Sequence, residues 1–387
     1  MKILIKGYYG HNNLGDDYIL YSILNSLNSV GKFDVTIVSA GNKYKDFFDR
    51  FQNLRVTEFC RDWKRFAKRF ALIRCDLWII GGGGLWPSEK SKNVHILLNE
   101  IKFAKKFGAK ICFYGIDINS INEPVNIEAW KDILDEVDLF IVRNSKTKHL
   151  LDGLKKNNVI KSSDITFGLI TSDEKQSSKS VLHKVGLNDQ EYILWAIPME
   201  FPENRKAERY SKFVASLQNL ANKSMFRNYT HVFLPFNYNK DLQLLEDISK
   251  GIDGKSIICD NSFALSIEEK RILFKYARSG VFMRFHSVMF SIYYALPGVF
   301  ISYSDKTSDV LRDVGLEDHF IEYGIKSDED FCREFDLDED KAILMADSII
   351  KDDTVFRERL ELASNYLKRQ ADSAKEEFET YIRRLCR

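Results

Sequence analysis

Short apolar runs alternate with longer segments of helical periodicity along the whole chain, and this alternation limits the folds open to it. Runs rich in β-branched and aromatic residues that carry few charges are typical of buried parallel strands. The helical segments between them would supply the crossovers that parallel strands require. The pattern predicts an α/β fold with parallel sheets, with strands at 2–6, 34–39, 76–80, 110–114, 138–142, 192–197, 231–235, 256–259, 281–284 and 299–302.

These strand candidates form two series of similar size, separated by a segment without large apolar residues. A length of 387 residues suffices for two domains. We expect a Rossmann-like domain at 1–170, a linker at 171–180 and a second Rossmann-like domain at 181–350. From Phe356 on, apolar residues recur every three or four positions, which predicts a long amphipathic helix at 351–387. This helix is expected to lie across both domains, with a dimerising coiled coil as the alternative.

Composition excludes several classes of function. The 57 basic and 56 acidic residues nearly cancel, so the basic excess typical of nucleic-acid binding is missing and no nucleic-acid partner is expected. The six cysteines include no CxxC pair, so no metal site is expected from their spacing. The N-terminus lacks the organisation of a signal peptide, and no apolar run approaches the roughly 20 residues of a membrane span. We therefore expect a cytoplasmic protein.

The loop after the first expected strand reads GYYGHNNLGDD at 7–17 and leads into an apolar-periodic helix. Its glycines would let the backbone approach a ligand, and the helix N-terminus would offer unpaired N–H groups. The glycine spacing does not match the dinucleotide-binding pattern GxGxxG. Asp16 would either belong to a site or cap the helix. The candidates in this loop are Gly10, His11, Asn13 and Asp16.

Four consecutive glycines follow the strand DLWII, and an arginine follows the strand LFIV. A glycine run costs chain entropy and packs nothing, so we expect something to approach this backbone closely, with a tight turn as the alternative. The arginine would pair with an anion or form a surface salt bridge. Ligands of open sheets bind at strand ends. The candidates here are Gly82, Gly83, Gly84 and Arg143.

The strand VFMRF leads through RFHS into an apolar helix. Arg284 and His286 lie two residues apart, so they share one face if the chain is extended there. Arginine grips a carboxylate or phosphate with two hydrogen bonds, and histidine supplies a proton near neutral pH. A histidine satisfied within the core is the alternative. Ser302 and Lys306, which follow the next strand, complete this candidate set.

A basic segment studded with aromatic residues covers 61–74. It is either a solvated face whose apolar side lies in the core or a surface that contacts an anionic membrane. Its basic and aromatic residues are Arg61, Trp63, Lys64, Arg65, Phe66, Lys68, Arg69, Phe70 and Arg74.

Taken together, these motifs resemble those of the polysaccharide pyruvyl transferase family. GYYGHNNLGDDYIL is similar to the family's glycine–asparagine–glycine–acid loop, and GGGG, the arginine of VRNS, Asp164, and RFHS followed by SYSDK occur in the family's order. The resemblance implies a GT-B-like fold of two Rossmann-like domains facing a cleft. It also implies the transfer of pyruvate from phosphoenolpyruvate, a co-substrate used without cofactor or metal, to a sugar of a surface or cell-wall polysaccharide as a ketal.

By the same resemblance, Arg284 would hold the donor and His286 would act as acid or orient the donor, beside Ser302 and Lys306. His11 or Asp16 would act as the base for the acceptor, a glycan or lipid-linked saccharide at the inner face of the membrane. Gly10, Asn13, Gly82–Gly84 and Arg143 would line the acceptor side. The chain departs from the family at Trp195–Pro198, where many relatives have an arginine, and at Arg143–Asn144, where they have arginine–aspartate. The alternatives are a nucleotide-sugar glycosyltransferase of the same fold and a non-catalytic glycan-binding relative.

Overall fold

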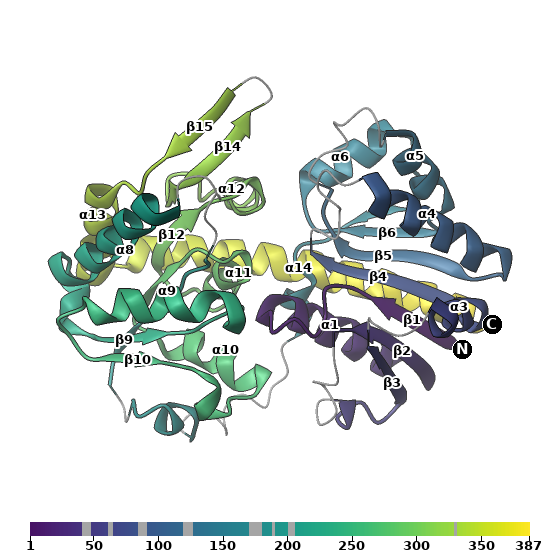
Figure 1. The fold of residues 1–387 in the computed structure, drawn as a ribbon, viewed down its shortest axis with the longest axis horizontal. Coiled ribbons are helices and arrows are strands. Elements are labelled where there is room, and N and C mark those ends of the chain that lie inside the picture. The colour runs from purple at the N-terminus through teal and green to yellow at the C-terminus, as the bar shows by residue number, and fades with distance from the viewer. Residues whose placement is uncertain are drawn as a thin grey trace. The chain divides into compact units, whose positions relative to one another are not determined.

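The chain divides into two compact units, which we describe separately (Figure 1). The first contains Met1–Ile170 and Leu367–Arg387, and the second contains Thr171–Tyr366. Of the expected linker at 171–180, the structure describes only Ser180. The computed structural model describes residues 1–40, 48–60, 65–83, 91–118, 127–169, 180–187, 190–199, 206–328 and 331–387.

The described part of the first unit contains a seven-stranded parallel sheet in the order β3-β2-β1-β4-β5-β6-β7. The chain first adds strands on one side of β1 and then on the other, so the direction of the strand order reverses between β1 and β4. The strands are β1 (Lys2–Lys6), β2 (Phe33–Ser39), β3 (Leu54–Cys60), β4 (Leu77–Gly83), β5 (Lys110–Ile116), β6 (Leu139–Val142) and β7 (Val159–Lys161).

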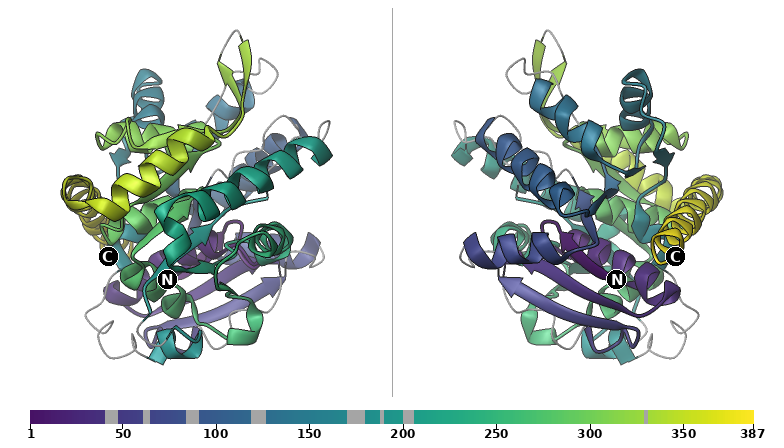
Figure 2. Two further views of the ribbon diagram at one scale, coloured as in Figure 1. Left: turned by 90° about the vertical axis from the view of Figure 1, so that its left-hand side faces the viewer. Right: turned by 90° about the vertical axis from the view of Figure 1, so that its right-hand side faces the viewer.

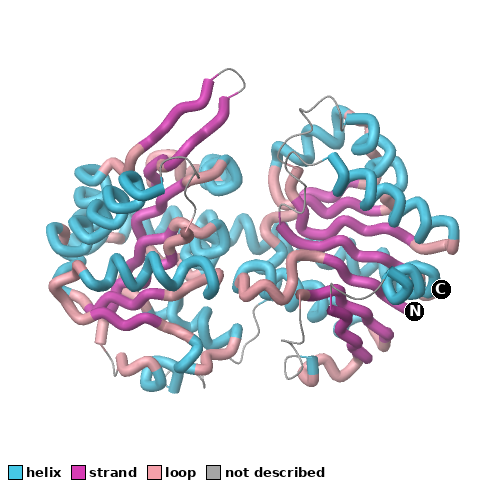
Figure 3. Tube along the Cα trace, in the orientation of Figure 1, coloured by secondary structure: helices cyan, strands magenta, loops and turns pink. Residues whose placement is uncertain are grey.

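Helices cover both faces of this sheet because its strands are apolar on both sides (Figure 3). One face packs against α1 (Leu14–Val30) and the end of α14 (Thr354–Leu385), through side chains such as Ile23 and Phe378. The other face packs against helices that contribute Leu72, Leu98 and Ile133. These helices are α3 (Arg65–Arg74), α4 (Ser91–Lys106), α5 (Ile127–Glu136) and α6 (Ser145–Gly153), and the short η1 (Ile165–Leu169) follows β7.

The described part of the second unit contains a six-stranded parallel sheet in the order β10-β9-β8-β11-β12-β13. Here the order reverses between β8 and β11. A two-stranded antiparallel hairpin, β14 (Gly324–Asp328) and β15 (Phe331–Phe335), extends beyond the helices of this unit (Figures 1 and 2). The six strands are β8 (Tyr192–Ala196), β9 (Thr230–Phe233), β10 (Ser256–Ile258), β11 (Ser279–Phe282), β12 (Gly298–Ser302) and β13 (Phe320–Glu322).

The second sheet is also covered on both faces. One core joins it to α8, α9 and α13, and aromatic rings such as Phe274 and Phe282, which stack at 5.4 Å, join the other face to α10 and α11. The helix α14 belongs to this unit up to Tyr366 and to the first unit from Leu367. The helices are α8 (Lys206–Lys223), α9 (Tyr238–Lys250), α10 (Ile267–Tyr276), α11 (Phe285–Tyr293), α12 (Asp305–Asp313) and α13 (Glu339–Lys351), with the short η3 (Met225–Asn228) and η4 (Asn261–Phe263).

All ten expected strands are present, but one boundary matters for the site. The expected strand at 281–284 is β11, which ends at Phe282, and Arg284 is instead the N-cap of α11. The expectation that Arg284 and His286 share one face of an extended chain is therefore wrong, because His286 lies in the first helical turn. The sequence did not predict the hairpin strands β14 and β15 or, in the parallel sheets, β3, β7 and β13. The latter three are edge strands, which do not need a continuous apolar run because one side of each lacks a neighbouring strand.

Candidate functional site

The carboxyl ends of β8 and β11 mark the point at which the strand order of the second sheet reverses. In open parallel sheets, ligands bind outside the strand ends at such a switch point. Arg284 lies two residues after the end of β11, Met199 follows β8, and Asp241 lies in the first turn of the helix after β9. The parallel topology therefore brings three separate segments of the chain to one edge of the sheet.

Arg284 forms a two-pronged ion pair with Asp241 at this edge. Arg284 Nε donates to Asp241 Oδ2 at 3.2 Å, and Arg284 Nη2 donates to the other carboxylate oxygen. The Asp241 side chain is fully buried and also accepts the backbone N–H groups of Asn237 at 2.8 Å and Met199 at 3.2 Å. This carboxylate therefore fixes the direction of the guanidinium, whose side chain remains 13% exposed.

The other donor-side candidates lie at the ends of β11 and its neighbour β12. His286 is half-buried, and its ring contacts Phe285 edge-on with centroids 5.2 Å apart. Ser302 is fully buried and donates to the carbonyl oxygen of Ser304 at 3.0 Å, so its hydroxyl shapes the loop after β12. Lys306 is half-buried in the first turn of α12. All four candidates thus follow two adjacent strands.

Three helices begin at this edge without a side-chain cap among the described residues. The N-caps of α9, α11 and α12 are Asn237, Arg284 and Ser304, and none accepts a hydrogen bond from its first turn through its side chain. By contrast, α10 and α13 have capping side chains. The first N–H groups of a helix lack partners within the helix and carry a partial positive charge. Helix N-termini close to an arginine are a common setting for anion binding in proteins.

The sequence did not single out Asn237 and Asp241, although both belong to this cluster. Asn237 is 5% exposed, and its Oδ1 meets no hydrogen-bond partner in the structure. A buried amide oxygen without a partner is unfavourable, which favours a ligand or water beside it. The sequence signal that could have identified them is a pair of polar residues, Asn237 and Asp241, four positions apart at the start of the helix after a buried strand.

The segment Trp195–Pro198, which covers the end of β8 and the two residues after it, is part of the core. Trp195 is fully buried and donates its Nε1–H to Nδ1 of His231 at 3.0 Å. Burial lowers the pKa of His231 to about 4 because the imidazolium would lose its hydration. The carbonyl oxygen of Ala196 accepts the N–H groups of Met283 at 3.1 Å and Arg284 at 3.3 Å. This segment supports Arg284 through its backbone.

The first sheet has its own switch point, between β1 and β4, and the predicted loop lies there. Asn13, not Asp16, is the N-cap of α1, because its side chain accepts the N–H of Gly15 at 3.3 Å. Its amide also donates to the carboxylate of Asp16, which is 7% exposed. The half-buried His11 stacks on Tyr8 with ring centroids 3.9 Å apart. Gly10 has φ +80°, and a Cβ there would lie 2.8 Å from the backbone nitrogen of Ala40.

The glycines at the end of β4 are required by internal packing. A Cβ on Gly81 would lie 2.5 Å from Cδ1 of Ile23, and one on Gly82, which has φ +82°, would lie 2.7 Å from Cγ2 of Ile19. The expected close approach therefore comes from α1 itself. Gly83 ends β4, and Gly84 lies outside the described residues.

Arg143 is 5% exposed, so the alternative of a surface salt bridge is wrong. Its Nε donates to Asp117 Oδ2 at 3.0 Å, and its Nη1 reaches Asp164 Oδ2 at 3.5 Å. Burial alone would lower the pKa of Arg143, but the carboxylates of Asp117, Asp164 and Asp16 outweigh it and raise the pKa. Asn144 caps α6 by accepting the N–H of Thr147 at 2.8 Å, which gives this departure from the family a local structural role.

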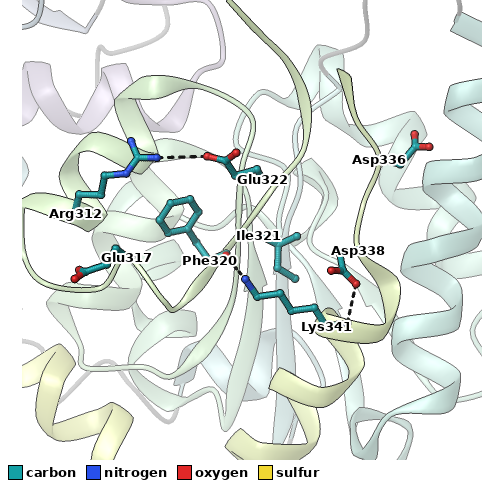
Figure 4. A pocket seen from close by; sticks show the side chains of 8 residues that line it. All are labelled: Arg312, Glu317, Phe320, Ile321, Glu322, Asp336, Asp338 and Lys341. Carbon is teal, nitrogen blue, oxygen red and sulfur yellow. Dashed lines mark hydrogen bonds and ion pairs between the residues drawn. The ribbon is translucent and has the colours of Figure 1, made fainter. Parts of the chain in front are cut away.

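Away from these residues, a groove of about 590 Å³ lies along the edge strand β13 (Figure 4). Arg312 contacts Glu322 at 3.4 Å across it, and Lys341 Nζ donates to the carbonyl oxygen of Phe320 at 3.1 Å. None of the predicted site residues lines this groove. Within the described residues, no cluster of histidine, cysteine or acidic side chains is arranged to hold a metal ion, and no helix has an apolar stretch long enough to cross a bilayer.

The fold is similar to that of several solved structures. S. aureus MnaA with UDP matches with a TM-score of 0.63 and 11% identity, covering 98% of this chain and 95% of that chain. UDP-GlcNAc 2-epimerase from Neisseria meningitidis matches with a TM-score of 0.62 and 10% identity, covering 99% and 100%. E. coli ADP-heptose lps heptosyltransferase II matches with a TM-score of 0.50 and 12% identity, covering 91% and 99%. The fold is thus that of GT-B glycosyltransferases and related epimerases.

Sequence comparison identifies the family. A search of curated protein sequences found no match. The model of the polysaccharide pyruvyl transferase family matches residues 13–305, which is well over half of the chain and includes the loop at Asn13, Arg143 and the Arg284–His286 segment. The chain therefore belongs to the polysaccharide pyruvyl transferase family.

Proposed function

We propose that this protein transfers pyruvate from phosphoenolpyruvate to a sugar of a surface or cell-wall polysaccharide and forms a pyruvate ketal. Family membership indicates a pyruvyl transferase with a polysaccharide acceptor. The observation that carries the finer proposal is the edge of the second sheet, where Arg284 lies beside the uncapped N-termini of α9, α11 and α12. Guanidinium and helix N–H groups favour the two anionic groups of this donor.

The charge arrangement also supports a small donor with two anionic groups. Asp241 accepts hydrogen bonds from Nε and Nη2 of Arg284. These two bonds hold the guanidinium in one orientation. Lys306 adds a cation in the first turn of α12, near the end of the adjacent strand. In this proposal, Arg284 and the helix N-termini supply the positive charge, and the reaction proceeds without a metal ion or further cofactor.

The reaction needs one proton delivered and two removed. His286 protonates the methylene carbon of the donor, or orients the donor for that protonation, and the central carbon becomes electron-poor. A sugar hydroxyl adds to that carbon and loses its proton, and the C–O bond to phosphate then breaks. A second hydroxyl adds to the same carbon and loses its proton to close the ketal. One of the two released protons replaces the proton given to the methylene carbon, and the other leaves on the phosphate as hydrogen phosphate. Asp16 or His11 of the first unit accepts a proton from the acceptor. Preorganised charge usually contributes the largest share of such catalysis.

The acceptor is a glycan or a saccharide carried on a lipid. Phosphoenolpyruvate is a cytoplasmic metabolite, so the proposal places the protein in the cytoplasm, at the inner face of the membrane where lipid-linked acceptors are presented. Asn13, Gly10 and the backbone of Gly82–Gly83 lie at the carboxyl edge of the first sheet and would form part of the acceptor side. Arg143 acts in this proposal through its carboxylate partners, because its guanidinium is buried among them.

The test is an assay of phosphate release with phosphoenolpyruvate and a panel of glycosides that carry two neighbouring free hydroxyl groups. Mass spectrometry of the glycoside would identify the ketal. We expect His286→Ala to lower the rate by about 10²–10⁴-fold, the usual contribution of a general acid. His183→Ala is the matched control, because His183 is exposed on the same unit. A normal rate in His286→Ala would remove this residue from the mechanism, and turnover of nucleotide sugars in place of phosphoenolpyruvate would contradict the proposal.

A further inference from the structure

The helices α3 and α4 expose large apolar side chains on the surface of the first unit. Phe70 and Ile73 on α3 are 58% and 40% exposed, and Ile96 on α4 and Phe107 just after it are 51% and 48% exposed. The two helices pack against each other and cover the same face of the sheet. The exposed residues therefore belong to neighbouring elements of one layer.

The spacing of residues along α3 places Phe70 and Ile73 on the outward side of the helix. Arg69, Phe70, Ile73 and Arg74 recur at spacings of one, three and four, so they lie on one side of the helix, and all four are exposed. Leu72 points to the opposite side and is 2% exposed. The expectation that the apolar side lies in the core is therefore wrong for Phe70 and Ile73. An apolar centre flanked by two arginines faces the solvent.

The sequence of these two segments is basic, although the chain as a whole carries only +1. The segment 61–74 contains six basic residues and one acidic residue, and α4 contains four lysines and one glutamate. Lys102 and Lys105 of α4 are paired with aspartates at 2.9 Å. On α3, Arg69 and Arg74 are exposed beside Phe70 and Ile73. Residues 61–64 and the side chains of 65–68 lie outside the described part of the structure, and Arg69 and Arg74 are the basic residues of this segment that it describes.

We propose that the outward surface of α3 and α4, formed by Phe70, Ile73, Ile96 and Phe107 with Arg69 and Arg74, binds an anionic phospholipid membrane. Aromatic and aliphatic side chains that enter the headgroup region beside basic residues are typical of interfacial helices. Anionic lipid attracts each nearby arginine or lysine by about 1 kcal/mol. The charge therefore selects a lipid surface over a neutral apolar partner.

If the proposed function is correct, membrane binding by this surface would serve to bring the protein to a lipid-linked acceptor. Each crossover helix of a parallel sheet starts at the carboxyl edge and ends toward the amino edge. The N-termini of α3 and α4 therefore lie at the edge that carries the Gly10–Asp16 loop, whereas Arg69–Arg74 in the second half of α3 and Phe107 after α4 lie toward the opposite edge. A membrane bound there would keep the first unit at the surface on which a lipid-linked acceptor is presented.

The test is flotation of the full-length protein with vesicles of phosphatidylcholine alone or mixed with phosphatidylglycerol. We expect binding only to the mixed vesicles, with affinity falling as salt is raised. Arg69→Gln and Arg74→Gln should each weaken binding about fivefold. Phe70→Ser combined with Ile73→Ser should weaken it about tenfold or more. The melting temperature of each variant, measured in parallel, distinguishes lost binding from lost folding.

The matched control is Leu344→Ser combined with Leu362→Ser, because these leucines are 69% and 71% exposed on the second unit. This control should bind vesicles as the wild type does. Equal binding to both kinds of vesicle, no binding to either, or normal binding by folded α3 variants would overturn the proposal. The proposal would also be overturned if the α3 variants changed the molecular mass measured by light scattering and still bound vesicles normally. That result would assign the surface to contact with a second copy of the chain. The assay contains neither donor nor acceptor, so its outcome is independent of the proposed reaction.

Discussion

Replacing Arg143 by methionine tests whether the buried cluster beneath the first sheet's carboxyl edge is a structural centre. The guanidinium is bound to Asp117 and Asp164, whose side chains are each 1% exposed. Methionine has a similar length and no charge, so the substitution leaves two carboxylates buried without the cation that now balances them. Burial of an unbalanced carboxylate is costly because the interior solvates charge poorly.

The expected loss follows from this geometry. Removing one partner of a buried ion pair costs about 3–5 kcal/mol. For a folding unit of this size, 1 kcal/mol lowers the melting temperature by about 2–4 °C, so we expect a loss of about 10 °C in the transition that includes the first unit. Arg312→Met is the control, because Arg312 is 51% exposed and contacts a partly exposed Glu322 at 3.4 Å. Exposed pairs contribute about 1 kcal/mol or less, so the control should lose no more than a few degrees.

Differential scanning calorimetry of the wild type and both variants at pH 7 measures these differences. Combining Arg143→Met with Asp117→Asn and Asp164→Asn removes the stranded charges and should recover part of the loss. A melting temperature for Arg143→Met within 2 °C of the wild type would refute the account of Arg143 as a buried structural cation.

Three further predictions concern other parts of the structure. In urea unfolding, Gly82→Ala should destabilise the protein by about 1–3 kcal/mol more than Gly108→Ala. Both glycines have positive φ, but only at Gly82 does a side chain lie within 3 Å of the added Cβ. Equal losses in the two variants would contradict the packing role of Gly82. Asp241→Asn should raise the dissociation constant for phosphoenolpyruvate about tenfold by releasing Arg284, whereas an unchanged constant would show that the ion pair does not position it. Folding lowers the pKa of His231 from 6.5 to about 4, so the unfolded chain alone binds this proton as pH falls through that window. Between pH 7 and pH 5, the melting temperature of His231→Gln should therefore fall less than that of the wild type. Equal falls in the two proteins would refute this.

The sequence predicted the central strands of each sheet, and several of them have runs that are apolar on both faces. Continuous segments such as DLWII and LFIV have this character because helices cover both sides of each sheet. β3 was missed because it carries Arg55 and Glu58 at the edge of the first sheet, where a strand is less enclosed. The sequence analysis overestimated the length of the strand before Arg284. Met283 and the aliphatic part of Arg284 continue the apolar run of the strand, but the helix α11 begins at Phe285.

The sequence located the strand ends at which the candidate residues lie but not the partners of those residues. Asp241 comes 43 residues before Arg284, and only the parallel order of β9, β8 and β11 brings them together. The same limit applies to Arg143, whose partners Asp117 and Asp164 follow two other strands. The sequence predicted a close approach to the glycines that the structure places at the end of β4, but local sequence did not reveal that Ile19 and Ile23 of α1 make that approach.

The central claim is that the carboxyl edge of the second sheet, with Arg284 at its centre, binds a small donor with two anionic groups. Isothermal titration of phosphoenolpyruvate into the wild type and into Arg284→Met tests it most directly, with Arg312→Met as the folded control for loss of an arginine. The account predicts saturable binding of one donor per chain in the wild type and the control, and a loss of at least tenfold in Arg284→Met. Equal binding by Arg284→Met, or no binding of phosphoenolpyruvate beside clear binding of a nucleotide sugar, would contradict it.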